Sequence, residues 1–199
     1  ITKVIMAFSF ASALSLVVMA GAELFTGNNF VMAAASFKKE ISWLDTLKLW
    51  VVCYLGNFVG AVILVALFQL GGVPKGATGE YFATIAAGKM GGTASALFFK
   101  GMLCNMLVCL AVWCCTKLKT ESGKLIMIFW CIYIFMACGF EHSIANMSVM
   151  AVGLLNGAGV EGVSIAGYFH NLLWVTLGNI AGGAILVAFP YYIIQKKKK

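Results

Sequence analysis

Two short polar segments interrupt apolar stretches of this chain and share one pattern of residues. Each places a glutamate shortly after a glycine and an asparagine five residues after the glutamate: Glu23 with Asn28 in the first, and Glu141 with Asn146 in the second. A carboxylate or an amide inside a lipid bilayer is costly unless it satisfies broken backbone or lines a polar path. The pattern therefore predicts two broken membrane-spanning helices and a route for a solute beside the breaks.

His142 is the residue of the second segment best suited to chemistry. It follows Glu141 directly, and an imidazole there could donate a proton or a hydrogen bond to an anion crossing the membrane. The alternative is a histidine that only ties down the broken backbone. Thr26 lies in the first segment, where its hydroxyl could replace one water of a small solute or form a local cap. His170 lies near the start of the last apolar run, and we expect it at the membrane interface.

The two glutamates could be mistaken for a catalytic carboxylate pair. Bare carboxylates would repel an anion, so we expect Glu23 and Glu141 to turn away from the path and to accept hydrogen bonds from amides of the adjacent loops. Asparagine suits the same supporting task, because its amide can satisfy both a freed carbonyl and a freed N–H group. The asparagines expected in this role are Asn28, Asn146, Asn57, Asn105 and Asn179.

Each break is predicted to separate two half-helices. Gly21 and Gly139 are expected to end the first halves, and Asn28 and Asn146 to cap the second halves. The free amides at the start of each second half then face the centre of the membrane, where their partial positive charge favours anions.

The composition is that of an integral membrane protein. Apolar residues make up 62% of the chain, charged residues 11%, and the mean hydropathy is +0.96. The charge-free runs predict five helical spans in one bundle, since a span needs roughly 20 apolar residues. The short alternating segments of a transmembrane barrel are absent from the sequence. The first run has no basic leader and continues into the Glu23 segment, so we do not expect it to be a cleavable signal peptide. The runs are Val4–Ala22, Leu49–Pro74, Gly101–Thr116, Leu125–Phe140 and Gly162–Gln195.

A second repeated feature follows each break. The pairs Gly56-Asn57 and Gly178-Asn179 begin the next spans in similar contexts, which indicates an internal duplication. We expect a partial first repeat over residues 1–72 and a second over 93–195, together one channel domain over 1–199. The span before the second break has no counterpart in the first half, so the sequence is expected to begin one helix late. The whole would have six spans as an inverted repeat.

The lysines indicate the orientation. Ten of them fall on one side of the predicted membrane, which should be cytoplasmic and should contain the C-terminus. The glycine-rich stretch 71–92 is expected to be an external loop. Lys89 and Lys100 could raise the anion concentration at the outer mouth or could only snorkel to the interface. The ten lysines are Lys38, Lys39, Lys48, Lys117, Lys119, Lys124 and the terminal four, Lys196–Lys199.

The remaining residue types favour a pore without a cofactor. The seven cysteines lie in apolar spans without metal-ligand spacing, so we expect free packed thiols and no metal. The positive charge lies between spans and indicates topology, not a nucleic-acid partner. Apolar constrictions that force dehydration could come from Phe10, Leu14, Phe25 and Phe135, although each could also be ordinary packing.

Three motifs resemble the formate/nitrite transporter family: residues 23–26 (ELFT), 139–147 (GFEHSIANM) and 178–183 (GNIAGG). The resemblance covers essentially the whole chain and is strongest to the hydrosulfide ion channels. It implies an aquaporin-like protomer of six helices with its own pore, assembled as a homopentamer among the lipids of the cytoplasmic membrane. It also implies passage of small monovalent anions or their conjugate acids.

The family's functional residues transfer to matching positions. The resemblance makes His142 the central histidine, Thr26 the hydroxyl of the first loop, and Lys89, in preference to Lys100, the lysine of the outer vestibule. It also places Leu24, Phe25 and Phe135 at constrictions. The first break begins Ala22-Glu23 where formate channels commonly have aspartate, which weakens a formate assignment. The resemblance to the hydrosulfide channels favours hydrosulfide, with formate or nitrite as the alternative.

Two other functions are disfavoured. A true aquaporin needs Asn-Pro-Ala in its breaks, and the only prolines are Pro74 and Pro190. A membrane-embedded enzyme using His142 and Glu141 would need a nucleophile or metal cluster, which the sequence does not indicate, so we expect no enzyme.

Overall fold

The structure, a computed structural model, describes residues 2–157 and 159–196, with side chains from residue 4 onward. All regular elements in these ranges are helices, which confirms the predicted all-helical membrane fold. They are α1 (Thr2–Ala20), α2 (Phe25–Phe37), α3 (Trp43–Leu70), α4 (Ala77–Met90), α5 (Ala94–Lys117), α6 (Glu121–Ala137), α7 (Ser143–Asn156), α8 (Ile165–Ala181), the π-helix η1 (Gly182–Ala188) and α9 (Phe189–Lys196).

Both predicted breaks are present. The axes of α1 and α2 differ by 52° across the first break, and the second separates α6 from α7. Gly21 (φ 69°) and Gly139 (φ 67°) follow the ends of α1 and α6 in the left-handed conformation, as expected. The expected caps are wrong: Leu24 and His142 are the N-cap residues, and both asparagines lie one turn inside their helices.

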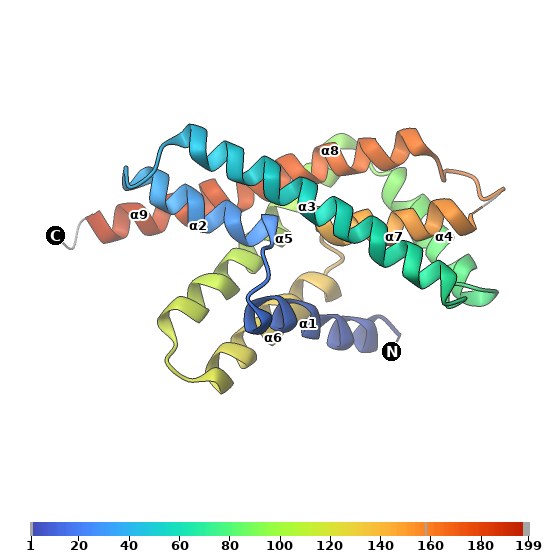
Figure 1. Ribbon diagram of the computed structural model, residues 1–199, viewed down its shortest axis with the longest axis horizontal. Helices are drawn as coiled ribbons and strands as arrows, with labels where there is room; N and C mark the ends of the chain where they lie inside the picture. Colours follow the sequence, from blue (N-terminus) through green and yellow to red (C-terminus); the bar gives the residue numbers. More distant parts are fainter. Residues whose placement is uncertain (1, 158, 197–199) are drawn as a thin grey trace.

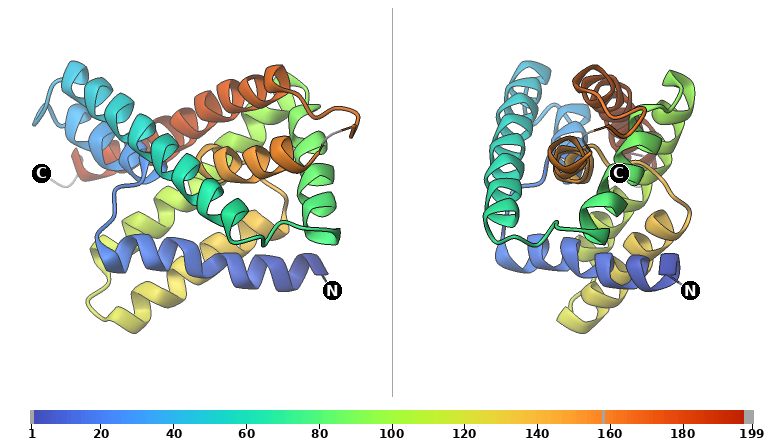
Figure 2. Two further views of the ribbon diagram at one scale, coloured as in Figure 1. Left: turned by 45° about the vertical axis from the view of Figure 1, so that its right-hand side comes forward. Right: turned by 90° about the vertical axis from the view of Figure 1, so that its right-hand side faces the viewer.

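The two broken pairs run in opposite directions (Figure 1). The pair α1 and α2 runs from the N-terminus toward the end that holds the C-terminus, whereas α6 and α7 run the other way. The N-terminal ends of α2 and α7 therefore meet in the middle of the molecule. α7 lies at the centre of the bundle and packs against α3, α4 and α8 (Figure 2).

The lengths of the helices only partly match the five predicted spans. Within the described residues, α3, α5 and the continuous segment Ile165–Lys196 are long and apolar enough to cross a membrane, and α1 with α2 forms a bent fourth span. α6 has 17 residues and α7 has 14, so each falls short of that length. The predicted span over 125–140 is therefore the first half of a second broken element.

The prediction of one long loop over residues 71–92 is wrong for the middle of that stretch. Residues 77–90 form α4, which packs against α7 and buries Ala83 and Ala86 completely. A side chain at Gly153 would collide with Ala86 and the carbonyl of Phe82. The two helices approach too closely there for any larger residue.

Glycines bring α5 and α8 into similarly close contact. A Cβ at Gly178 would overlap the carbonyl oxygen of Phe98, and one at Gly182 would overlap that of Met102. By contrast, a Cβ at Gly56 or Gly60 of α3 would meet no atom of the described chain within 4 Å. Of these four glycines, only Gly178 and Gly182 permit a close helix contact within the described chain.

Candidate functional site

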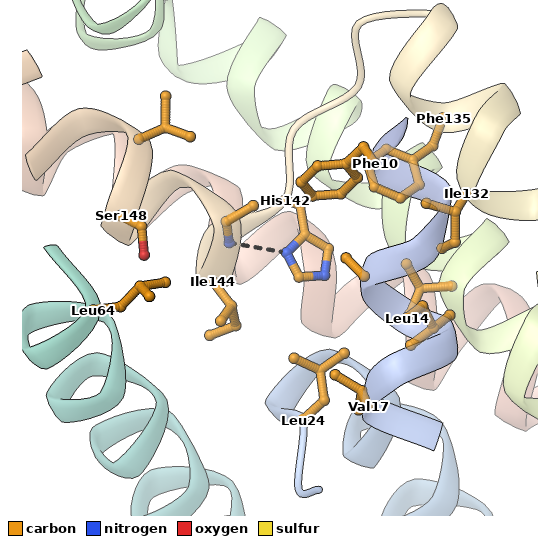
Figure 3. A pocket seen from close by; sticks show the side chains of 14 residues that line it. Phe10, Leu14, Val17, Leu24, Leu64, Ile132, Phe135, His142, Ile144 and Ser148 are labelled. Carbon is orange, nitrogen blue, oxygen red and sulfur yellow. Dashed lines mark hydrogen bonds between the residues drawn. The ribbon is translucent and has the colours of Figure 1, made fainter. Parts of the chain in front are cut away.

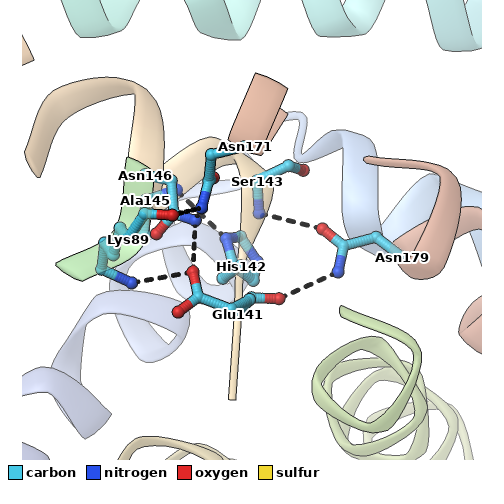
Figure 4. Close-up of polar contacts among 8 residues, drawn as sticks. All are labelled: Lys89, Glu141, His142, Ser143, Ala145, Asn146, Asn171 and Asn179. Carbon is cyan, nitrogen blue, oxygen red and sulfur yellow. Dashed lines mark hydrogen bonds and ion pairs between the residues drawn. The ribbon is translucent and has the colours of Figure 1, made fainter. Parts of the chain in front are cut away.

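The side chains of the two breaks meet where α2 and α7 begin. His142 Nε2 lies 3.0 Å from Thr26 Oγ1, across 116 positions of sequence. The other ring nitrogen, Nδ1, accepts a hydrogen bond of 3.2 Å from the backbone N–H of Ala145 (Figure 4). An accepting Nδ1 carries no proton, so the proton of the neutral ring is on Nε2. His142 therefore directs its one N–H donor, on Nε2, toward the hydroxyl of Thr26.

Each break is held by an asparagine from a later helix. Asn57 of α3 accepts a hydrogen bond from the N–H of Phe25 through Oδ1 and donates to the carbonyl of Glu23 through Nδ2, both 3.0 Å. Asn179 of α8 does the same in the second break. It accepts from the N–H of Ser143 (2.9 Å) and donates to the carbonyl of Glu141 (3.1 Å) (Figure 4). The two breaks thus share one pattern of support.

The asparagine on α5 joins the two halves. Asn105 is fully buried, and its Nδ2 donates to Asn29 Oδ1 (3.1 Å) and to the carbonyl of Asn179 (2.7 Å). Asn29 lies on α2 and Asn179 on α8. The amide therefore connects the helix after the first break to the helix that supports the second.

The two glutamates accept hydrogen bonds from the asparagines five residues later. Asn28 donates to Glu23 Oε2 (2.7 Å), and Asn146 donates to Glu141 Oε2 (2.6 Å). Among the described residues, only the second glutamate has a lysine within 4.0 Å. Lys89 Nζ lies 2.9 Å from Glu141 Oε2, and the two side chains are 21% and 9% exposed. The ammonium group of Lys89 is therefore neutralised beside the central histidine.

The second predicted lysine lies elsewhere. Lys100 is exposed, and only its backbone carbonyl reaches the break, where it accepts from the N–H of Glu141 (3.3 Å). His170 is half-buried, with Nε2 3.1 Å from the carbonyl of Gly92. Neither side chain reaches His142 in this structure.

A cavity of about 400 Å³ lies against the ring of His142 (Figure 3). Among the predicted constriction residues, Phe10, Leu14, Leu24 and Phe135 line it, and the ring of Phe135 stacks on that of His142 at 6.0 Å. Phe25 does not line it; its ring packs edge-on against Tyr54 at 4.9 Å. Thr26 is fully buried and is not among the residues that line the cavity.

The structure also adds residues that sequence reasoning missed. Asn171 accepts from Asn146 (2.9 Å) and donates to the carbonyl of Lys89 (2.9 Å), so it fixes the helix end that presents the lysine. Ser148 and His142 are the two lining residues of the cavity with polar side chains. Asn171 lies in an apolar run, and an isolated asparagine in a span was the one available signal. For Ser148 no signal distinguished it from other small residues of a helix.

The comparisons with known proteins agree with this geometry. The family described as "Formate/nitrite transporter" matches residues 1–193. The chain is similar to the nitrite transporter NirC of Escherichia coli (strain K12), with 40% identity over 205 residues, 99% of this chain and 73% of that protein.

Two solved structures are also similar. One is called an FNT family ion channel, with a TM-score of 0.90 and 36% identity over 96% of this chain and 77% of that one. The other is a pentameric formate channel with formate bound, with a TM-score of 0.85 and 29% identity over 98% of this chain and 83% of that one. These relatives are channels and transporters, so the expectation that the chain is not an enzyme is confirmed. The chain belongs to the formate/nitrite transporter family.

Proposed function

We propose that this chain is a channel that passes small monovalent anions, or their conjugate acids, through the cavity beside His142. The observation that carries the proposal is the position of this ring, which joins two opposed helix breaks and borders a cavity whose other lining side chains, apart from Ser148, are apolar. The matching nitrite transporter and formate channel support the same class of substrate.

His142 acts in this proposal as a neutral hydrogen-bond donor. Its Nδ1 is committed to the N–H of Ala145, so a second proton there would break the cap of α7 and add charge at a helix N-terminus. Nε2–H is held only by the hydroxyl of Thr26. An anion that reaches the ring takes this hydrogen bond in place of Thr26, and the hydroxyl of Thr26 restores the ring's position after the anion leaves.

The apolar wall explains why such a donor is needed. A bare ion pays a large desolvation penalty in a cavity lined by Phe10, Leu14, Leu24 and Phe135. Charge relief by hydrogen bonding, or by passage as the conjugate acid, lowers this barrier. The half-helix dipoles and the exposed ammonium group of Lys100 then serve to gather the anion, whereas the charge of Lys89 is already balanced by Glu141.

Among the possible substrates we propose hydrosulfide. Its conjugate acid is abundant near neutral pH and weakly hydrated, and therefore suits an apolar cavity better than the stronger formic and nitrous acids. The resemblance of the break motifs supports the same choice. Formate and nitrite are the alternatives, as the relatives' names indicate.

The assembly and orientation are proposed from the same observations. A homopentamer follows the arrangement named for the similar formate channel. The α2–α3 turn, the α5–α6 turn and α9 lie at one end of the molecule (Figure 1), and most of the lysines in the described part of the chain lie in or beside these segments. By the positive-inside rule we propose that this end faces the cytoplasm.

The test is flux into proteoliposomes, measured by stopped-flow light scattering with hydrosulfide, nitrite and formate salts. His142→Phe removes the donor and should lower the flux of all three by about 10- to 150-fold, the worth of a hydrogen bond to a charged group. Hydrosulfide should give the fastest flux in the unsubstituted protein. His170→Phe is the matched control, since that imidazole lies away from the cavity, and it should keep its flux.

Two results would contradict the proposal. Unchanged flux in a folded His142→Phe protein would remove the histidine from the path. Faster flux of nitrite or formate than of hydrosulfide would leave the anion channel intact and overturn the substrate assignment.

A further inference from the structure

A groove of about 330 Å³ lies at the lysine-rich end of the molecule and shares no lining residue with the cavity beside His142. It runs between the turn that joins α2 to α3 and the last helix, α9. Its polar lining is three lysines, one glutamate, one tyrosine and one glutamine: Lys38, Lys39, Lys196, Glu40, Tyr192 and Gln195. The transport path does not use any of these residues.

The wall of the groove is ordered by aromatic contacts and by the backbone of the turn. Phe37 stacks on Tyr192 at 5.7 Å and packs on Phe189 at 5.3 Å, which joins the end of α2 to α9. Lys39 adopts the left-handed conformation (φ 61°), the one such non-glycine residue in the described chain. A lysine is mildly strained there. The turn therefore fixes the direction in which the lysine side chain leaves the backbone.

The groove carries unbalanced positive charge. Lys38, Lys39 and Lys196 are exposed, and in the described part of the chain none of them lies within 4.0 Å of a carboxylate. Glu40 is the single opposing charge in the lining. The ammonium groups, the phenol of Tyr192 and the amide of Gln195 are all hydrogen-bond donors, a set that suits a phosphate group.

Apolar side chains continue from the groove along the outside of the bundle. Trp43 and Leu44 at the start of α3 are 48% and 60% exposed, and Ile193 and Ile194 of α9 are 38% and 51% exposed. A free phosphate ion would gain nothing from these surfaces. A phospholipid would gain from both, because its headgroup would meet the lysines while its acyl chains cover the apolar residues.

We propose that this groove binds the headgroup phosphate of an anionic phospholipid from the leaflet at the lysine-rich end. The lysines hold the phosphate, and Tyr192 and Gln195 complete its hydrogen bonds. The acyl chains lie along the beginning of α3 and along α9. The bound lipid joins the α2–α3 turn to the C-terminal helix.

The experiment is native mass spectrometry of the detergent-purified protein, titrated with phosphatidylglycerol, with phosphatidylcholine and with inorganic phosphate. The test variant is the triple substitution Lys38→Gln, Lys39→Gln and Lys196→Gln. The matched control removes the same charge at the same end but outside the groove: Lys117→Gln, Lys119→Gln and Lys124→Gln. We expect phosphatidylglycerol to be retained in preference to phosphatidylcholine, with a loss of roughly fivefold in affinity per groove lysine removed and a much smaller loss in the control.

Glu40→Gln provides an independent test that does not depend on the triple variant being well folded. It removes the one opposing charge from the groove and should strengthen phosphatidylglycerol binding. Equal losses in the two triple variants, or no gain from Glu40→Gln, would show a general charge effect and overturn the site. Displacement of the lipid by inorganic phosphate would identify a phosphate ion site and overturn the choice of a lipid.

Discussion

Single residues distinguish two helix breaks that share one supporting pattern. Leu24 and His142 occupy the same N-cap position, and Asn57 and Asn179 hold the two breaks through equivalent atoms. The chemistry differs because one cap is an apolar side chain and the other an imidazole. The duplicated pattern builds the centre, and one histidine gives it a hydrogen-bond donor.

The pair Lys89 and Glu141 is a second difference between the breaks, and it gives a stability prediction. Lys89→Met leaves the carboxylate of Glu141 largely buried with only Asn146 to stabilise it. Loss of one partner from a buried ion pair costs about 3 kcal/mol or more. We therefore expect the variant to unfold at a lower concentration of sodium dodecyl sulfate, in a titration monitored by circular dichroism. The double variant Lys89→Met with Glu141→Gln should recover most of the loss, because it removes the unpaired charge.

Glu23 supplies the control for this comparison of the Lys89 and Glu141 variants. It accepts from Asn28 as Glu141 does from Asn146, but it is exposed and has no lysine within 4.0 Å among the described residues. Glu23→Gln should therefore have little effect on stability with or without Lys89. If the loss of stability in the double variant of Lys89 and Glu141 equalled the sum of the two single losses, the two side chains would act independently, which would contradict the prediction.

For single residues, the sequence predicts the types that support the breaks well and the contacts between distant positions poorly. The repeated glutamate and asparagine pattern indicated the supporting residues, because the members of each pair are only five positions apart. The approach of Lys89 to Glu141 spans 52 positions, and that of Thr26 to His142 spans 116. No local pattern specifies such contacts. They follow from the way the helices pack.

The ends of the helices show how tertiary contacts override local preference. Asparagine is a favoured N-cap residue, yet Asn28 and Asn146 lie inside their helices and leucine and histidine occupy the caps. The reason is that the first free N–H groups, those of Phe25 and Ser143, are satisfied by Asn57 and Asn179 from other helices. The asparagines of the breaks are thereby free to bind the glutamates.

The crossing of α5 and α8 gives a prediction for the packing of elements. Gly178→Ala places a methyl group against the carbonyl of Phe98 and the backbone of Met102, and such overpacking costs about 1 to 3 kcal/mol. Gly56→Ala is the matched control, since Gly56 precedes Asn57 as Gly178 precedes Asn179 but has open space around it. We expect lower stability for Gly178→Ala and unchanged or slightly higher stability for Gly56→Ala in the same detergent titration. An equal loss of stability in both variants would contradict the conclusion that Gly178 is tightly packed and Gly56 is not.

For the molecule as a whole, the sequence predicted the helical class, the two breaks and their opposite directions. The prediction of a loop where α4 forms was wrong, because the glycines and Pro74 of that stretch are typical of a loop. The helix forms through packing that local propensity does not report: Ala83 and Ala86 are buried against α7, where Gly153 allows close approach. The five expected spans likewise came from counting apolar residues, which cannot separate a short half-helix from a complete span.

The cavity beside His142 lies within a single chain, lined by residues of α1, α3, α5, α6 and α7 together with Leu24. In the proposed pentamer each protomer would therefore conduct through its own pore, and no residue of a neighbour would be needed at the histidine. We expect pentamers that mix unsubstituted and His142→Phe protomers to lose flux in simple proportion to the fraction of variant protomers. The measurement is flux through proteoliposomes containing mixed assemblies, co-expressed with two affinity tags and purified in known ratios. A path shared by all protomers would instead lose nearly all flux when only some protomers carry the substitution, because a single altered ring would block it. A steep loss of that kind would place the conducting path between the chains and would contradict a pore built from the two breaks of one protomer.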